Sequence, residues 1–193
     1  MLEHTIAVVD FAHGGTTMLA GILQLLGVPM VGKHYRIEKC EDLEVIQAMH
    51  DEGKFQQVVE CRNRQHPVWG FKMPGAWHYA ELLKNNLRSP IFLAIFKDPV
   101  SVTRRRFGKV SRLRLISTLN QMQKAADGMR NNNLDVQLLS YLDACNNREL
   151  FVDNLIKIAQ LEPTHEQRRQ AVEFIQPNQT ARPIKYPEVL GYA

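Results

Sequence analysis

The stretch from Thr5 to Gly27 constrains the fold more than any other part of the chain. It begins with an apolar run rich in β-branched residues and passes through a turn that holds two glycines and two threonines. Its last part has apolar residues at the three- and four-residue spacing of one helix face. This order predicts a strand, a glycine-rich loop and a helix, and such a helix start favours a phosphate group. An ordinary strand-to-helix turn is the alternative.

The rest of the chain continues the alternation of strands and helices. Further strands are predicted at 28–32, 68–74, 91–96 and 136–141, and helices at 41–50, 55–65, 77–87, 99–129, 148–160 and 163–175. The helix after the strand at 91–96 has Asp98 as its N-cap and Pro99 at its first position, with a break at Gly108 left open. This pattern predicts an α/β three-layer sandwich with a mostly parallel central sheet. Ligands bind beyond the carboxyl ends of such strands, where the glycine loop, Lys72 and Lys97 are expected to meet.

Length and composition predict one domain and a soluble class of protein. The chain has 193 residues, of which 45% are hydrophobic, so residues 1–176 are expected to form one domain. The proline-rich segment 177–193 is predicted to be an extended arm. A net charge of +4 permits an anionic ligand without demanding nucleic acid.

Cysteine usage and the apolar segments exclude several other classes. The three cysteines are widely spaced and form no C-x-x-C pattern, which argues against a disulfide framework and a zinc site. Reduced thiols and a cytoplasmic location are therefore expected, with no metal. The N-terminus lacks the pattern of a signal peptide, and the most apolar region, 18–31, is too short to span a bilayer. No membrane partner is expected.

The loop sequence FAHGGTTML resembles the 5′-phosphosulfate loop of sulfotransferases, whose usual form is Pro-Lys/Arg-Ser-Gly-Thr-Thr before an apolar helix. Gly15, Thr16 and Thr17 match that form. Gly14 stands in place of the serine, and His13 in place of the basic residue. The Walker A motif is excluded, because no lysine precedes the first threonine.

A second segment, FLAIFKDPVSVTRRR, is similar to the motif with which sulfotransferases bind a 3′-phosphate. Lys97, Asp98 and Pro99 match, with lysine in place of the usual arginine. Arg105 occupies the position of the family serine, and Ser101 lies one helical turn before it on the same face. A charged helix start with solvated arginines is the alternative. The segments HPVWGFKMPGAWHY and 140–161 add to the resemblance.

The resemblance implies a P-loop NTPase-like sulfotransferase fold and 3′-phosphoadenosine 5′-phosphosulfate (PAPS) as co-substrate. The residues expected to bind it are Gly14, Gly15, Thr16, Thr17, Met18, Lys97, Ser101 and Arg105. His13, if protonated, or Lys72 would stabilise the charge that develops on the leaving group. Glu41 or His34 would take the proton of the acceptor. For Glu41 the alternative is an acidic residue that only favours the first turn of a helix.

The leading functional hypothesis is a sulfotransferase that moves a sulfuryl group from PAPS to a hydroxyl or amine acceptor. The first alternative is a non-catalytic nucleotide-binding or scaffolding protein, suggested by the loss of the basic loop residue. The second is a nucleic-acid-binding module that uses the basic cluster at 104–114. Helical spacing spreads those cations around the cylinder and few aromatic residues interleave, which disfavours this last reading.

Overall fold

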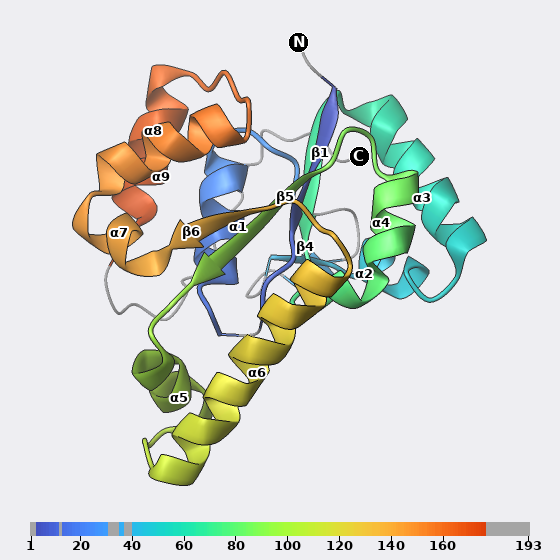
Figure 1. The fold of residues 1–193 in the computed structure, drawn as a ribbon. Helices are drawn as coiled ribbons and strands as arrows, with labels where there is room; N and C mark the ends of the chain where they lie inside the picture. The colour runs from blue at the N-terminus through green and yellow to red at the C-terminus, as the bar shows by residue number, and fades with distance from the viewer. Residues whose placement is uncertain (1–2, 12, 31–34, 37–39, 177–193) are drawn as a thin grey trace.

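The computed structural model describes residues 3–11, 13–30, 35–36 and 40–176. Four parallel strands form a sheet in the order β4-β1-β5-β6. They are β1 (His4–Val8), β4 (Val68–Lys72), β5 (Ile91–Phe96) and β6 (Val136–Ser140). Helices cover both faces of this sheet (Figure 1). The predicted three-layer α/β arrangement is therefore confirmed.

The register of the sheet brings the carboxyl ends of the strands together. In the central strand β1, Ile6 and Val8 pack on one face of the sheet and Ala7 packs on the other, as the two-residue period of a strand requires. Val8 lies opposite Lys72 of β4, and the last residue of β5, Phe96, lies opposite Ser140 of β6. Because all four strands run in one direction, the segments that follow them share one edge, called here the carboxyl edge.

One face of the sheet is covered by the first helix and by the last three helices of the described residues. These helices are α1 (Thr16–Leu25), α7 (Tyr141–Asn146), α8 (Arg148–Ile158) and α9 (His165–Phe174). Leu19 and Leu23 of α1 pack with Phe151 and Leu155 of α8 against the sheet, and all four are buried. Burial of this apolar face stabilises α1, which no side chain among the described residues caps at its N-terminus.

The other face is covered by the middle of the chain. Its elements are α2 (Leu43–Ala48), α3 (Glu52–Gln65), the 3₁₀ helix η2 (Ala76–Tyr79), α4 (Ala80–Asn86) and the long helix α6 (Arg112–Asn131). Phe55, Trp69 and Leu83 are fully buried in its core. α6 approaches η2 so closely that a Cβ atom on Gly128 would lie 2.1 Å from the ring of Trp77.

The helix predicted at 99–129 is two helices. α5 (Pro99–Phe107) ends at Gly108, whose φ of 75° is the left-handed conformation that favours glycine. α6 then begins after Ser111, whose hydroxyl accepts a hydrogen bond from the N–H of Arg114. Figure 1 shows α5 and the first half of α6 as a hairpin that projects from the body beyond the carboxyl edge.

Other predicted boundaries also differ from the structure: α3 begins at Glu52 rather than at residue 55, and the helix expected at 77–87 is η2 followed by α4. The helix expected from Glu41 begins at Leu43, because the Asp42 carboxylate accepts hydrogen bonds from the N–H groups of Glu44 and Val45 and so caps α2. Glu41 and Asp42 form the short strand β3 (Glu41–Asp42), antiparallel to β2 (Tyr35–Arg36). The strand expected at 136–141 ends at Ser140, whose hydroxyl caps α7, a helix that the sequence pattern did not predict.

Two other predicted segments lie partly or wholly outside the described residues. Of the strand predicted at 28–32, residues 28–30 are described and form no regular strand, but the carbonyl of Pro29 accepts a hydrogen bond from the N–H of Gly70 in β4. The arm predicted at 177–193 lies outside the described residues. The single domain over residues 1–176 stays a prediction.

Candidate functional site

The loop between β1 and α1 has a backbone conformation that lets an anion approach its N–H groups closely. His13 and Gly15 have positive φ values of 71° and 121°. Gly15 is the N-cap of α1, and the first turn of this helix holds no acidic residue. The N-terminus of α1 therefore presents backbone N–H groups and the positive end of its dipole at the carboxyl edge, as an anion site requires. His13 itself is exposed.

Both loop glycines are required by close packing. A Cβ atom on Gly14 would lie 2.8 Å from the carbonyl oxygen of Ile95 and 2.9 Å from Oδ2 of Asp10. A Cβ atom on Gly15 would lie 2.8 Å from Cδ2 of Tyr141. The serine that sulfotransferases carry at the first of these positions does not fit here without a shift of β5 or of Asp10. The double glycine is thus a consequence of how the loop lies on β5 and α7.

Lys72 joins the loop to β3. Its Nζ atom lies 3.1 Å from Oε1 of Glu41 and donates a hydrogen bond to Oγ1 of Thr17 at 3.4 Å. The side chain of Lys72 is 3% exposed and that of Glu41 is 15% exposed, so water screens this ion pair poorly. The structure thus brings together three of the predicted site residues, from β4, β3 and the first turn of α1.

Cys40 precedes Glu41 and is buried beside the same ion pair. Burial raises the pKa of its thiol, the charge of Lys72 lowers it, and the charge of Glu41 raises it, with burial the largest effect. The thiol therefore stays protonated at neutral pH. A thiolate is the nucleophilic form of cysteine, so the site is not built for catalysis by this residue.

Lys97 contacts the ring of Tyr141, which in turn packs against the loop. Its Nζ atom lies 4.3 Å from the centre of the Tyr141 ring, within the range of a cation–π interaction. The same ring is the group that a Cβ atom on Gly15 would meet. Tyr141 therefore connects the β1–α1 loop to the end of β5. Sequence reasoning did not assign it to the site, although the segment 140–161 was part of the resemblance.

The remaining predicted residues occupy less defined positions. Ser101 lies in the first turn of α5, where its N–H donates to Oδ1 of Asp98 at 2.8 Å, and Arg105 is exposed one turn later. Thr16 is buried, and Met18 packs against the core under α1. His34 lies outside the described residues.

Asp10 was missed by the sequence reasoning. It follows β1, is fully buried, and accepts hydrogen bonds from the N–H of Phe11 at 2.6 Å and the N–H of Ile95 at 3.0 Å. Burial raises its pKa to about 7, although these two hydrogen bonds lower it. A carboxyl group that comes straight after a buried apolar strand was the signal available in the sequence.

The described residues hold no group of three or more histidine, cysteine or acidic side chains placed to bind a metal ion. The positive groups of the site are side chains and backbone N–H groups. Such an arrangement can bind a multiply charged organic anion at the carboxyl edge.

No protein-family model matches the chain, and no curated protein matches it either. Solved structures do match. The sulfotransferase domain of the Synechococcus PCC 7002 olefin synthase has a TM-score of 0.62 at 10% identity, with 100% of this chain and 84% of that chain covered. Retinol dehydratase in a complex with retinol and 3′-phosphoadenosine 5′-phosphate (PAP) has a TM-score of 0.51 at 10% identity, with 94% and 68% covered.

A kinase shares the same architecture. Shikimate kinase from Bacteroides thetaiotaomicron has a TM-score of 0.53 at 16% identity, with 82% of this chain and 99% of that chain covered. At these identities the similarity establishes the fold and leaves the reaction open. The chain has the P-loop-like α/β fold of the sulfotransferases, and its glycine loop occupies the β1–α1 position of that fold.

Proposed function

We propose that this protein binds PAPS at the carboxyl edge of its sheet and transfers the sulfuryl group to a hydroxyl or amine acceptor. The observation that carries the proposal is the meeting of the glycine loop with Lys72 and Lys97 at that edge. Each comes from a different strand end. Lys72 contacts Thr17 in the first turn of α1, and Lys97 contacts the ring of Tyr141, which packs on Gly15. The complex of retinol dehydratase, a structure of the same fold, with PAP supports the choice of nucleotide.

The residues present fit the two charged ends of this nucleotide. The backbone N–H groups after Gly15, with the hydroxyls of Thr16 and Thr17, are proposed to hold the 5′-phosphosulfate. Lys97, Ser101 and Arg105 are proposed to hold the 3′-phosphate, since charge-assisted hydrogen bonds from such donors bind phosphates well. The buried carboxyl of Asp10 lies beneath the loop and suits an anion when it is protonated.

In the proposed reaction a bond forms between sulfur and the acceptor oxygen or nitrogen as the bond from sulfur to the bridging oxygen breaks. Negative charge then develops on the leaving phosphate. Lys72 and a protonated His13 are proposed to stabilise that charge, because positioned cations contribute most to transfers of this kind. Glu41 is proposed to take the acceptor proton after exchanging its contact with Lys72, and His34 is the other candidate base.

Calorimetry with PAP and with ATP tests the nucleotide. We expect PAP to bind more tightly than ATP, since ATP lacks the 3′-phosphate. Lys97→Ala and Arg105→Ala should each weaken PAP binding by about tenfold or more, the value of one charge-assisted hydrogen bond. Arg104→Ala is the matched control, because Arg104 is an exposed neighbour on the same helix. Equal affinity for ATP and PAP would falsify the assignment.

A second candidate is a nucleotide-binding protein without catalysis. The observation that favours it is His13, an exposed imidazole where the sulfotransferase loop carries lysine or arginine. Transfer of labelled sulfate from PAPS to an acceptor, lost in His13→Ala, would rule this candidate out. Tight PAP binding without transfer to any hydroxyl or amine acceptor would favour it.

A further inference from the structure

The α5–α6 hairpin has an unbalanced charge. No aspartate or glutamate lies between Asp98 and Asp127, which flank most of the hairpin. The basic residues of the same stretch are Arg104, Arg105, Arg106, Lys109, Arg112, Arg114 and Lys124. The hairpin is therefore a strongly cationic projection on a chain whose net charge is only +4.

Two of these cations hold the hairpin together. The guanidinium carbons of Arg106 and Arg114 lie 4.8 Å and 5.5 Å from the centre of the Phe107 ring. Arg114 also donates a hydrogen bond to the carbonyl of Phe107 at 3.1 Å, and Arg106 donates to Gln121 on α6. These contacts fix the two helices to one another, so the hairpin is a defined structure.

Four other cations face solvent at the end of the hairpin. Arg104, Arg105, Lys109 and Arg112 are exposed, and no carboxylate within the described residues forms an ion pair with any of them. Solvated cations are common on protein surfaces. In this hairpin, exposed aliphatic side chains follow them along the chain.

Those aliphatic side chains lie along α6. Leu113, Ile116 and Leu119 are 80%, 43% and 45% exposed and follow one another at three-residue spacing, which places them along one side of the helix. The buried residues Thr118 and Ala125 lie on the opposite side, against α5 and the body. The apolar row therefore points away from the core of the protein.

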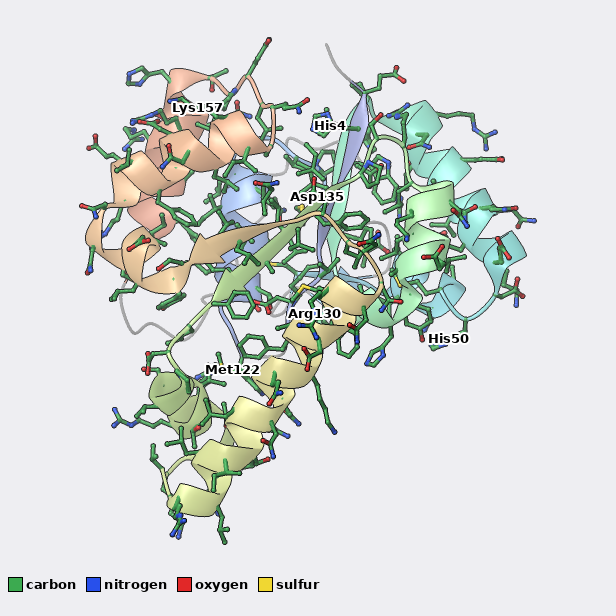
Figure 2. The ribbon with its side chains drawn as sticks, in the orientation of Figure 1. His4, His50, Met122, Arg130, Asp135 and Lys157 are labelled. Carbon is green, nitrogen blue, oxygen red and sulfur yellow. The ribbon has the colours of Figure 1, made fainter. Side chains whose placement is uncertain are left out.

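We propose that the hairpin tip, defined as Lys109, Val110, Arg112, Leu113 and Ile116, docks on an anionic lipid surface. Exposed cations beside exposed aliphatic side chains match the headgroup and acyl layers of such a surface. The hairpin projects from the body: in Figure 2, Met122 lies halfway along α6 and Arg130 lies near the sheet, and Figure 1 shows the first half of α6 extending beyond the body with α5. A nucleic acid would match the cations but leave the aliphatic row without a partner.

This docking is peripheral. None of the helices among the described residues is long and apolar enough to cross a membrane. The sequence-based expectation of no membrane partner rested on the lack of a spanning segment, and a surface contact needs none. The inference is also independent of the nucleotide site, because the hairpin tip includes no residue assigned to it.

The test is co-sedimentation of the full chain with vesicles. We expect binding to vesicles of equal parts phosphatidylcholine and phosphatidylserine, much weaker binding to phosphatidylcholine alone, and loss of binding as salt is raised. The double variant Lys109→Glu, Arg112→Glu should lower the affinity by at least about 25-fold, since each cation near such a surface contributes about fivefold. Leu113→Ser should lower it severalfold and leave the salt dependence unchanged.

Matched controls lie elsewhere on the molecule. Arg64→Glu with Lys157→Glu makes the same change in net charge on exposed positions of α3 and α8, and Leu150→Ser removes an exposed leucine from α8. Lys157 lies at the end of the molecule opposite the hairpin (Figure 2). Equal losses in the hairpin and control variants would overturn the proposal, as would a lack of vesicle binding at low salt. Thermal unfolding of each variant verifies that it is folded.

Discussion

At the scale of single residues, Asp10 places a carboxyl group beneath a loop that is shaped for anions. Its two oxygens accept hydrogen bonds from Phe11 and Ile95, so it also fixes β1 to β5 at the carboxyl edge. Because it is fully buried, ionisation of this group is costly, and its pKa of about 7 reflects that cost. The two hydrogen bonds favour the charged form, burial favours the protonated form, and protonation removes the charge that would repel an anion above it.

This pKa predicts a pH dependence of stability. The ordinary pKa of an aspartate is 3.8, so between about pH 4 and pH 7 the folded protein holds a proton that the unfolded chain has released. The free energy of unfolding should therefore fall as pH rises through this interval, by an amount on the order of a few kcal/mol. In Asp10→Asn this contribution disappears, because the amide does not titrate, and its NH2 group replaces one of the two oxygens that accept N–H donors.

Urea unfolding of both proteins over this pH range gives the measurement. Other carboxyl groups titrate equally in the two proteins, so the difference between the two curves isolates Asp10. We expect the free energy of unfolding of the variant to rise relative to that of the wild type as pH rises, and the difference to become constant above about pH 7. Parallel curves would show that Asp10 does not keep its proton in the folded state.

At the scale of elements, the hairpin depends on a hydrogen bond between two buried threonines. Oγ1 of Thr103 on α5 donates to Oγ1 of Thr118 on α6 at 2.8 Å, and both side chains are almost fully buried. Each hydroxyl also contacts a carbonyl one turn earlier in its own helix, from Pro99 and Arg114 respectively. Since α5 carries Ser101 and Arg105, this bond also positions the proposed 3′-phosphate ligands.

Substitution of these threonines should be non-additive. Thr103→Val or Thr118→Val removes the bond across the helices but leaves the other hydroxyl its bond to the carbonyl one turn earlier, so each should cost about 0.5 to 1.5 kcal/mol of unfolding free energy. The double variant replaces both hydroxyls by methyl groups of the same shape, so it should cost less than the sum of the two. Chemical unfolding of the four proteins closes this cycle, and additive losses would show that the two hydroxyls do not interact.

At the scale of the whole molecule, the sequence predicted the architecture and the placement of the glycine loop, Lys72 and Lys97 at strand ends. Strong apolar runs such as 91–96 predicted the sheet, and strand ends predicted the meeting of Lys72 and Lys97 with the loop. The contact of Tyr141 with Gly15, and the burial of Asp10 under Gly14, depend on how separate strand ends pack. Sequence periodicity carries no information of that kind.

The same limit explains the differences in boundaries. Asp42 looked like a residue inside the first turn of α2, yet its capping contacts and its ion pair with Arg62 of α3, at 2.9 Å, place it before the helix. That pair joins segments 20 residues apart, so a local pattern does not reveal it. Gly108, by contrast, was recognised as a point where the helix could break, because a glycine within a helical pattern indicates a break without reference to distant residues.

The packing of α6 on η2 connects the hairpin to the body of the protein. A Cβ atom on Gly128 would overlap the ring of Trp77, so Gly128→Ala forces α6 outward or displaces the ring. Overpacking of this kind should lower the free energy of unfolding by about 1 to 3 kcal/mol. Gly53→Ala in α3 is the control, because its Cβ atom would meet only Oδ1 of Asp51, at 3.6 Å. There the better helix propensity of alanine should raise stability by up to about 1 kcal/mol.

The two substitutions therefore make the same chemical change with opposite expected signs. Thermal and urea unfolding of both variants measures the difference directly. If Gly128→Ala stabilised the protein as Gly53→Ala should, a Cβ atom would fit between α6 and the Trp77 ring. Contact with η2 would then not hold the hairpin against the edge of the site. A loss confined to Gly128→Ala would instead show that close contact between helix and ring sets the position of α6, and with it the distance of α5 from the loop.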